Sequence, residues 1–289
     1  MIKHIKNIVA RIYYGFYYFL KTAFLNKDYI FVHWDKKKKN FGDIITPFLI
    51  SKITNKKIIR VARPKYLTEK HYFVIGSILD RATNFSIIWG SGFIDKNNYL
   101  NSAPLKVAAV RGPKTRELLL QHGIDCPEIY GDPALLLPRI YNPVLKCKKY
   151  KLGIVPHYVD RDNIILKEIA KNKNVKIIHI QNKNPLIVIS EILACEKIAS
   201  SSLHGIIVAD AYRIPSLWIK LSDEIAGNGF KFLDYFASVK RTDKDPFIME
   251  KFSKLEDLLV QFDDKKIDID INKLLLACPF GEKAKVNFS

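Results

Sequence analysis

The sequence predicts an α/β protein of two Rossmann-like, doubly wound domains that face each other across a cleft, preceded by an amphipathic N-terminal helix. The chain has 289 residues, which is enough for two domains of ordinary size. Its 48% hydrophobic and 26% charged residues are typical of a globular protein with buried cores. Short β-branched runs alternate with amphipathic segments, which is the pattern of parallel sheets covered by helices on both faces.

Residues 1–27 predict a helix with one apolar face. At helical spacing that face collects Ile5, Val9, Ile12, Phe16, Phe19 and Leu20. Its flanks carry Lys3, Lys6 and Lys21. Two interpretations fit this pattern: a basic, aromatic helix that lies in a membrane interface, or a first helix that packs on the core with a basic outer side. Arg11 and Lys21 make the segment too charged to span a bilayer, and it lacks the small-residue cleavage site of a secretory signal.

Residues 28–140 predict the first Rossmann-like domain. Strands are expected in the apolar runs YIFVHW, KIIRVA, YFVIGS, SIIWGSG, KVAAVRG and EIYGDP. Helices are expected over residues 44–53 and 114–122. A stretch rich in Pro and Lys, PRIYNPVLKCKKYK, then marks the connection to the second domain.

Residues 148–289 predict a second domain with the same alternation of strands and helices, followed by C-terminal helices. Strands are expected in LGIVPHY, VKIIHI, KIASSS and PSLWIK. Helices are expected over residues 162–171, 185–195 and 203–212. Because the second domain repeats the first, the two are expected to face each other as in GT-B glycosyltransferases.

The charge and the cysteines limit the classes of function. The formal net charge of +18, from 47 Lys and Arg against 29 Asp and Glu, favours phosphorylated substrates, polyanions or an anionic membrane surface. No nucleic-acid-binding motif is present, so nucleic acid is not an expected partner. The four cysteines are scattered without a CxxC pair, which indicates a reducing, cytoplasmic location. Without a Walker loop, a strand-led GxGxxG or a His/Cys cluster, no cofactor and no metal is expected.

Polar signatures follow the apolar runs at the places where strands should end. They are NFGD at 40–43, WGSG at 89–92, RGPKT at 111–115, YGDP at 130–133, PHYVD at 156–160 and SSSLHG at 200–205. The carboxyl ends of parallel strands form one rim of a doubly wound sheet, which is where ligands bind. We therefore expect these six segments to gather at the cleft.

Taken in order, several of these stretches resemble the polysaccharide pyruvyl transferase family. They are NFGDIITPFLI, VRGPKTRELL, YGDPALLLP, SSSLHGIIVADAYRIPSLWI and FKFLDYF. The resemblance covers nearly the whole chain after the first helix. It implies a GT-B fold and transfer of the enolpyruvyl part of phosphoenolpyruvate onto sugar hydroxyls, usually as a cyclic pyruvate ketal. The implied acceptor is a cell-surface polysaccharide or its lipid-linked oligosaccharide precursor. The scattered cysteines and the interfacial interpretation of the first helix predict a location in the cytoplasm, peripheral on the inner membrane.

The resemblance assigns two catalytic residues. Arg111 matches the family arginine that binds phosphoenolpyruvate, and a guanidinium can hold a carboxylate or phosphate through two hydrogen bonds. His204 matches the family histidine, and an imidazole can transfer the proton that the methylene carbon of the donor needs. The ordinary alternatives are a surface arginine at a helix start for Arg111 and a half-buried, helix-capping histidine for His204.

The remaining signature residues are candidates for substrate binding. They are Asn40, Gly42, Asp43, Ser91, Gly92, Asp132, His157, Ser200, Ser201, Ser202, Gly205 and Lys231. Four of these residues also have a purely structural interpretation. Asp43 can cap the following helix, Asp132 can form an Asx-turn, His157 can sit in a solvated loop, and Lys231 can lie on a helix surface. The hydroxyls of residues 200–202 and the helix start behind them are expected to take a phosphate.

One position departs from the family. Many members carry an arginine two residues before the histidine, where this chain has Ser202. Lys231 or His157 could supply the missing cation. The departure also leaves open a sugar-nucleotide glycosyltransferase with the same two-domain cleft, or a non-catalytic module that binds anionic glycans.

Overall fold

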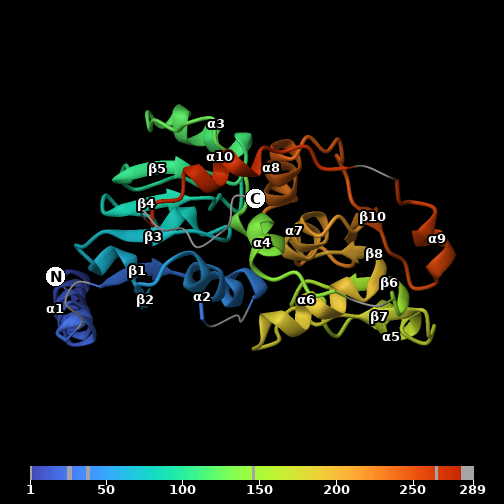
Figure 1. The fold of residues 1–289 in the computed structure, drawn as a ribbon. Coiled ribbons are helices and arrows are strands. Elements are labelled where there is room, and N and C mark those ends of the chain that lie inside the picture. The colour runs from blue at the N-terminus through green and yellow to red at the C-terminus, as the bar shows by residue number, and fades with distance from the viewer. Residues whose placement is uncertain (1, 25–27, 37–39, 145–146, 264–265, 281–289) are drawn as a thin grey trace.

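Two parallel five-stranded sheets lie side by side, each with helices packed around it (Figure 1). The computed structural model describes residues 2–24, 28–36, 40–144, 147–263 and 266–280, without the side chains of residues 2–5. The mixed α/β class predicted from the sequence is confirmed.

The sheet of the first half has the strand order β2-β1-β3-β4-β5. Its strands are β1 (Tyr29–His33), β2 (Lys57–Val61), β3 (His71–Phe73), β4 (Ser86–Trp89) and β5 (Lys106–Ala109). All the pairings are parallel. Alternate residues of β1 point to opposite faces, so Ile30 and Val32 join the main core while Phe31 joins a smaller cluster on the other face. Burial on both faces explains the nearly continuous apolar runs.

The helices of the first half are α2 (Phe41–Ile53), α3 (Pro113–Gln121) and α4 (Leu137–Ile140), with short 3-10 turns η1 (Pro64–Tyr66), η2 (Leu79–Arg81) and η3 (Pro133–Leu136). The strand predicted in EIYGDP is reduced to a single bridge between Val110 and Tyr130. The reason is local: Gly131 takes a positive φ of 127°, and Asp132 then caps the turn η3, which ends the extended chain.

The sheet of the second half has the order β10-β9-β8-β6-β7, again with parallel pairings. Its strands are β6 (Tyr150–Val155), β7 (Val175–Ile177), β8 (Cys195–Ser200), β9 (Ser216–Lys220) and the unpredicted β10 (Phe247–Ile248). Its helices are α5 (Ile164–Ile169), α6 (Pro185–Leu193), α7 (Leu203–Ala211), α8 (Phe230–Ser238) and α9 (Leu255–Leu259).

The last described helix, α10 (Ile271–Leu276), returns to the first half of the molecule (Figure 1). Trp89 on β4 donates a hydrogen bond from its indole N–H to the carbonyl of Leu274 at 2.8 Å. Phe280 packs edge-on against the same indole. The predicted second domain, 148–289, therefore includes a helix that packs on the first sheet, while residues 281–289 lie outside the described chain. The main core also crosses between the halves, because α2 contacts α6 and α7 contacts η3.

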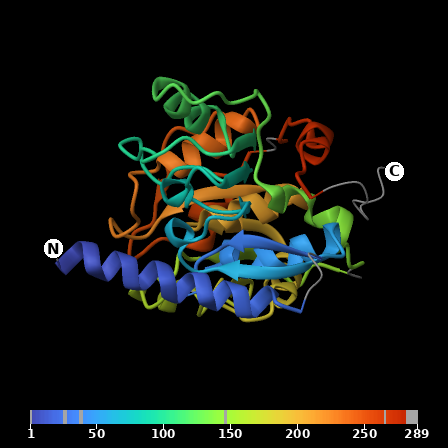
Figure 2. The ribbon, with the colours of Figure 1, turned by 90° about the vertical axis from the view of Figure 1, so that its left-hand side faces the viewer.

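Helix α1 (Ile2–Thr22) lies across the outside of the first half (Figure 2). Tyr18 is buried, and its hydroxyl accepts a hydrogen bond from the backbone N–H of Ala62 at 3.0 Å. The apolar face predicted from the sequence is exposed at Val9, Ile12, Phe16, Phe19 and Leu20. The interpretation in which this face packs on the core is therefore wrong. Residues 1 and 25–27 of the predicted segment, and the side chains of Lys3 and Ile5, lie outside the described part of the chain.

Candidate active site

A cavity of about 370 Å³ opens between the two halves of the molecule. The first half contributes the loops after β1, β3 and β4 together with the start of α2. The second half contributes the loops after β6, β8 and β9 together with the first turn of α8. Every contributing loop follows the carboxyl end of a parallel strand, as expected for a ligand site in a sheet of this kind.

His204 lies at the wall where the two halves meet. It is the second residue of α7, and its side chain is almost completely buried while still lining the cavity. Its ring packs directly over Gly42 of α2, where an added Cβ atom would lie only 2.3 Å from the imidazole Cε1. Glycine is therefore needed at position 42 for this close approach. The contact joins two signatures, NFGD and SSSLHG, that are far apart in the sequence.

Asp132 stands behind the imidazole. Its Oδ1 accepts a hydrogen bond from the backbone N–H of Ala134 at 2.9 Å, which confirms the predicted Asx-turn. Its Oδ2 lies 3.6 Å from His204 Nε2. Both of these atoms are buried and have no hydrogen-bond partner among the described residues. The carboxylate is placed to orient the ring.

Asp43 also lines the cavity, and it does not cap α2 as predicted. The N-cap is Asn40, whose side chain accepts from the N–H of Phe41, whereas the Asp43 carboxylate accepts from the N–H of Asp35 at 2.7 Å. Burial raises the pKa of Asp43 to about 6, and the hydrogen bond from Asp35 and the charge of His204 act in the opposite direction. A carboxyl group with this pKa can exchange protons near neutral pH.

The serine-rich turn is used mainly within the fold. Ser200 Oγ lies 2.8 Å from the carbonyl of Val155 and accepts from the N–H of Ser202. Ser201 Oγ donates to a carboxylate oxygen of Asp160 at 2.8 Å and accepts from the N–H of His157. Of the three serines, only Ser202 lines the cavity, which differs from the expectation that all three hydroxyls face a ligand. Glycine is needed at position 205, because a Cβ atom on that residue would lie 2.2 Å from the Ser200 hydroxyl oxygen.

Cationic and polar groups of the second half face the cavity near His204. His157 follows β6, Lys231 lies in the first turn of α8, and both are less than 10% exposed. The interpretations as a solvated loop and a helix-surface lysine are therefore wrong. Across the cavity, Arg81 contacts Asp35 through an ion pair of 3.3 Å.

Arg111 is not among the residues that line the cavity. Its fully buried guanidinium donates to Asp234 at 2.9 Å, to the carbonyl of Phe93 at 2.6 Å and to the hydroxyl of Ser77 at 2.6 Å. The Asp234 carboxylate also accepts from the N–H and the hydroxyl of Thr115. The arginine predicted to hold the donor thus joins the first half to α8, and it reaches the cavity only through Ser77.

Two glycines allow this buried ion pair to form. A Cβ at Gly92 would lie 2.6 Å from the guanidinium carbon, and one at Gly112 would lie 1.9 Å from the carbonyl oxygen of Asp234. Ser91 is buried beside them, and its carbonyl accepts from the N–H of Arg111. The WGSG and RGPKT signatures therefore serve the packing of the two halves rather than the cavity wall.

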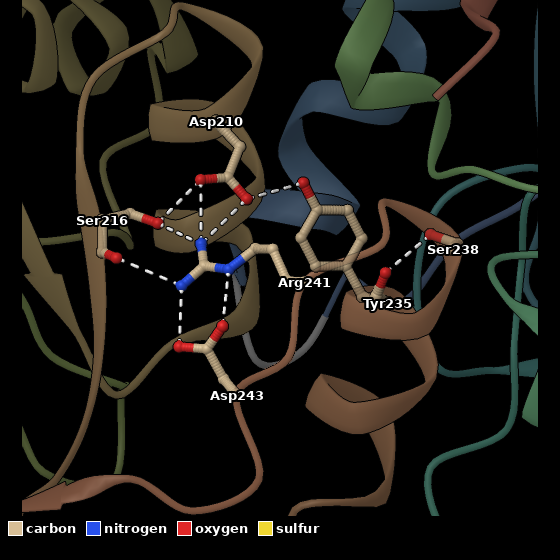
Figure 3. A network of polar contacts seen from close by, with 6 residues as sticks. All are labelled: Asp210, Ser216, Tyr235, Ser238, Arg241 and Asp243. Atoms are coloured by element: carbon tan, nitrogen blue, oxygen red, sulfur yellow. Dashed lines mark hydrogen bonds and ion pairs between the residues drawn. The ribbon is translucent and has the colours of Figure 1, made fainter. Parts of the chain in front are cut away.

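A second buried network fixes α7 relative to α8 (Figure 3). Arg241 contacts both carboxylate oxygens of Asp210 at the end of α7, at 3.0 and 3.1 Å. Tyr235 of α8 donates its hydroxyl proton to the same carboxylate at 2.9 Å. Ser216 and Asp243 occupy the remaining guanidinium donors. Because α7 carries His204 and α8 carries Lys231, this network sets the spacing of two cavity side chains.

Sequence reasoning missed several cavity residues. Asp35 follows β1, Ser77 follows β3, and Glu224 follows β9, and all three line the cavity. Ser77 ends the run expected to form the strand YFVIGS, and Asp35 comes directly after the run YIFVHW, so both carried the same signal as the signatures. Glu224 lies in a polar stretch after PSLWIK and carried no such signal. Within the described ranges, no group of three or more His, Cys, Asp or Glu side chains is arranged to hold a metal ion.

The two parallel sheets and the buried histidine–carboxylate pair at the rim between them define an α/β enzyme with its active-site cleft between two halves. The family model for polysaccharide pyruvyl transferase matches residues 5–223, and the chain belongs to this family. The resemblance read from the sequence is confirmed, and so is the assignment as a transferase of that type. Lys231 and Asp234 lie beyond the matched range.

Two relatives are similar to this chain over about 70% of its length. The uncharacterized protein L143 of Acanthamoeba polyphaga mimivirus is 30% identical over 214 residues, which cover 72% of this chain and 74% of that protein. The succinoglycan biosynthesis protein ExoV of Rhizobium meliloti (strain 1021) is 28% identical over 210 residues, covering 70% of this chain and 62% of ExoV. No solved structure gives a significant match.

Proposed function

We propose that this enzyme transfers the enolpyruvyl group of phosphoenolpyruvate to a sugar hydroxyl and closes it to a pyruvate ketal during assembly of a cell-surface polysaccharide. The observation that carries the proposal is the position of His204, which lines the cavity with the Asp132 carboxylate behind it, while a second carboxylate, Asp43, lines the same cavity. The family membership supports the pyruvyl transfer. The proposed acceptor is a glycan or a lipid-linked oligosaccharide.

The reaction requires two proton transfers. When a sugar hydroxyl adds to C2 of phosphoenolpyruvate, the methylene carbon C3 must receive a proton and becomes a methyl group. The bond between C2 and the phosphate oxygen then breaks, and a second hydroxyl adds to C2 to close the ketal. Of the two hydroxyl protons, one is balanced by the new methyl hydrogen and the other leaves with inorganic phosphate.

The ionisable groups of the cavity fit these two transfers. In the proposed mechanism His204, as the imidazolium, donates the proton to C3. Asp43 accepts the proton of the attacking hydroxyl, because a carboxyl group with a pKa of about 6 is mostly ionised at neutral pH. Asp132 orients the imidazole. Two groups with different environments thus take the acid and base roles.

The phosphate and carboxylate of the donor need positive partners. The first N–H groups of α7 have no acceptor within the helix and carry the positive end of its dipole. His157 and Lys231 line the same cavity as His204. In the proposed GT-B-like arrangement the donor lies against the second half. Many family members have an arginine where this chain has Ser202, and here Lys231 supplies that positive charge.

The test is mass spectrometry of a glycan acceptor incubated with the enzyme and phosphoenolpyruvate. The expected product carries the mass of a pyruvate ketal, and inorganic phosphate is released in equal amount. His204→Gln should lower kcat by about a hundredfold or more, the usual size of a lost acid-base group. His179→Gln is the matched control, because His179 is exposed and lies outside the cavity.

Two results would contradict the proposal. A product formed from a nucleotide sugar but not from phosphoenolpyruvate would identify a glycosyltransferase with this fold. Wild-type kinetics in a correctly folded His204→Gln variant would remove the imidazole from the proton transfer and leave it a structural role.

A further inference from the structure

Helix α1 carries an apolar face that is exposed in the described chain. Six large side chains form it: Val9, Ile12, Tyr13, Phe16, Phe19 and Leu20, each between 57% and 68% exposed. We call these six residues the α1 apolar face. A contiguous exposed patch of this kind marks an interaction site, whereas single exposed apolar residues need no explanation.

The fold holds this face outward. Tyr18, on the opposite side of the helix, is buried against Phe31 of β1, with the ring centroids 5.5 Å apart. Tyr14 stacks on Tyr66, and the hydroxyl of Tyr66 donates to the side chain of Asn7 at 3.1 Å. The helix therefore lies along the outside of the first half (Figure 2). Its contacts through Tyr14 and Tyr18 place the tyrosine side toward the protein. Its orientation is set by these contacts and leaves the α1 apolar face to an external partner.

The charges around the face indicate the kind of partner. Residues 1–27 contain four lysines and one arginine and no Asp or Glu. Lys6, Arg11 and Lys21 are exposed on the helix, and Arg63 and Lys65 lie in the segment that contacts it. An apolar face on a helix whose charged side chains are all cations complements a bilayer surface with anionic headgroups. A second copy of the chain, related by twofold symmetry, would bring these same cations against each other.

We infer that α1 lies in the interface of an anionic lipid bilayer, with its apolar face among the acyl chains and its cations at the headgroups. The helix lies along the membrane rather than through it, since no helix within the described ranges is long and apolar enough to cross one. The lipid contact does not depend on the donor. If the proposed function holds, the same contact keeps the cleft close to lipid-linked acceptors.

The experiment is flotation of the full chain with vesicles of phosphatidylcholine, with and without phosphatidylglycerol. The protein should float with the anionic vesicles only. The double variant Ile12→Ser, Phe16→Ser should lower the partition coefficient about tenfold or more, because both side chains leave the acyl region. Phe252→Ser is the matched control: Phe252 is 83% exposed but lies in the second half, so its loss should change nothing.

A charge variant tests whether the cations of α1 contact the anionic headgroups. Replacing Lys6, Arg11 and Lys21 by Gln should weaken binding to anionic vesicles about fivefold per charge, or roughly a hundredfold in all. Circular dichroism and the thermal midpoint check that each variant is folded. Substitutions are preferred to removal of residues 1–27, because removal would also uncover Phe31 and its apolar neighbours under Tyr18.

Four outcomes would overturn the inference. They are no binding to anionic vesicles, equal binding to neutral vesicles, binding unchanged in the Ile12→Ser, Phe16→Ser variant, and a dimer in sedimentation that this variant dissociates. The last outcome would make a second copy of the chain the occupant. Turnover on a water-soluble acceptor is measured in parallel and should be unchanged in the double variant. Failure of the wild-type enzyme to form a ketal would count against the proposed function alone.

Discussion

At the scale of single residues, the cavity combines groups whose roles the sequence could not separate. Asp43 and Asp132 both follow glycines near predicted strand ends, and both looked like turn or cap residues. The structure distinguishes them: Asp132 makes the turn and presents its second oxygen to His204, while Asp43 leaves the capping to Asn40 and faces the cavity. The difference arises because hydrogen bonds from neighbouring chain segments decide which oxygen of each carboxylate remains available.

The pKa of Asp43 gives a testable pH dependence. Burial raises this pKa to about 6, so below that pH the carboxyl group is protonated and cannot accept the proton of a sugar hydroxyl. We expect kcat/KM to rise with pH through about 6. In Asp43→Asn, turnover should fall about a hundredfold and this rising limb should disappear. Initial rates measured between about pH 5 and 8 check both expectations. An unchanged limb in the variant would assign it to another group.

At the scale of elements, the position of α8 depends on one buried ion pair. Arg111 follows β5 and precedes α3, and Asp234 lies on α8, so the pair joins the two halves of the molecule. The carboxylate also holds the first turn of α3 through Thr115. The resemblance to the family predicted that Arg111 binds the donor, whereas the contacts observed here make it a positioning residue.

Breaking this pair should chiefly affect stability. Arg111→Met leaves the Asp234 carboxylate buried without its partner, which should cost about 3 to 5 kcal/mol of unfolding free energy. Adding Asp234→Leu should recover a large part of that loss, because no buried charge then remains uncompensated. Arg116→Met is the control, since Arg116 pairs with the exposed Glu128 and its loss should cost about 1 kcal/mol or less. Denaturant unfolding measures all three variants.

A different result for Arg111→Met would contradict this structural role. If Arg111→Met is as stable as the wild type but raises the KM for phosphoenolpyruvate, the arginine contacts the donor directly. The ion pair with Asp234 would then have to open when the donor binds.

At the scale of the whole molecule, the two halves are held together at several places. The Arg111–Asp234 pair, the apolar core shared by α2, α6 and α7, and the return of α10 to the first sheet all cross between them. The cavity walls are therefore positioned by contacts that surround it. Helices α8 to α10 supply part of this frame and one cavity lysine, although they lie beyond the range that the family model matches.

Binding of the donor should stabilise the whole fold. A ligand that binds only the native state raises the thermal midpoint, by about 5 °C for a chain of this size at a concentration about 100 times its Kd. We expect this shift with phosphoenolpyruvate and not with a nucleotide sugar. Lys231→Met should remove most of it, because Lys231 is a buried cation that lines the cavity together with His157 and His204. Lys114→Met, on the exposed side of α3, should leave it intact. A shift with nucleotide sugars alone would contradict the donor assignment.

Local patterns were sufficient for most of the secondary structure. Strands such as β1 and β8 and helices such as α2 and α7 were predicted from apolar runs and their spacing, because each pattern is contained within a few residues. The segment EIYGDP was misjudged, since its apolar run is cut short by a glycine with positive φ and a capping aspartate. The short β10 carries too few residues for a pattern.

The sequence by itself determined the α/β class, the family, and the strand ends at which chemistry would gather, because these depend on periodicity and on motifs read in order. Only the tertiary structure decided which polar residues face the cavity. Arg111 and Asp234 are 123 residues apart in the chain, and their ion pair keeps out of the cavity an arginine that the resemblance and its strand-end position had placed there. His204, by contrast, keeps its access because Gly42, from the other half, leaves room for the ring. Partners so distant in the sequence carry no periodic signal, so their pairing appears only when the chain is folded.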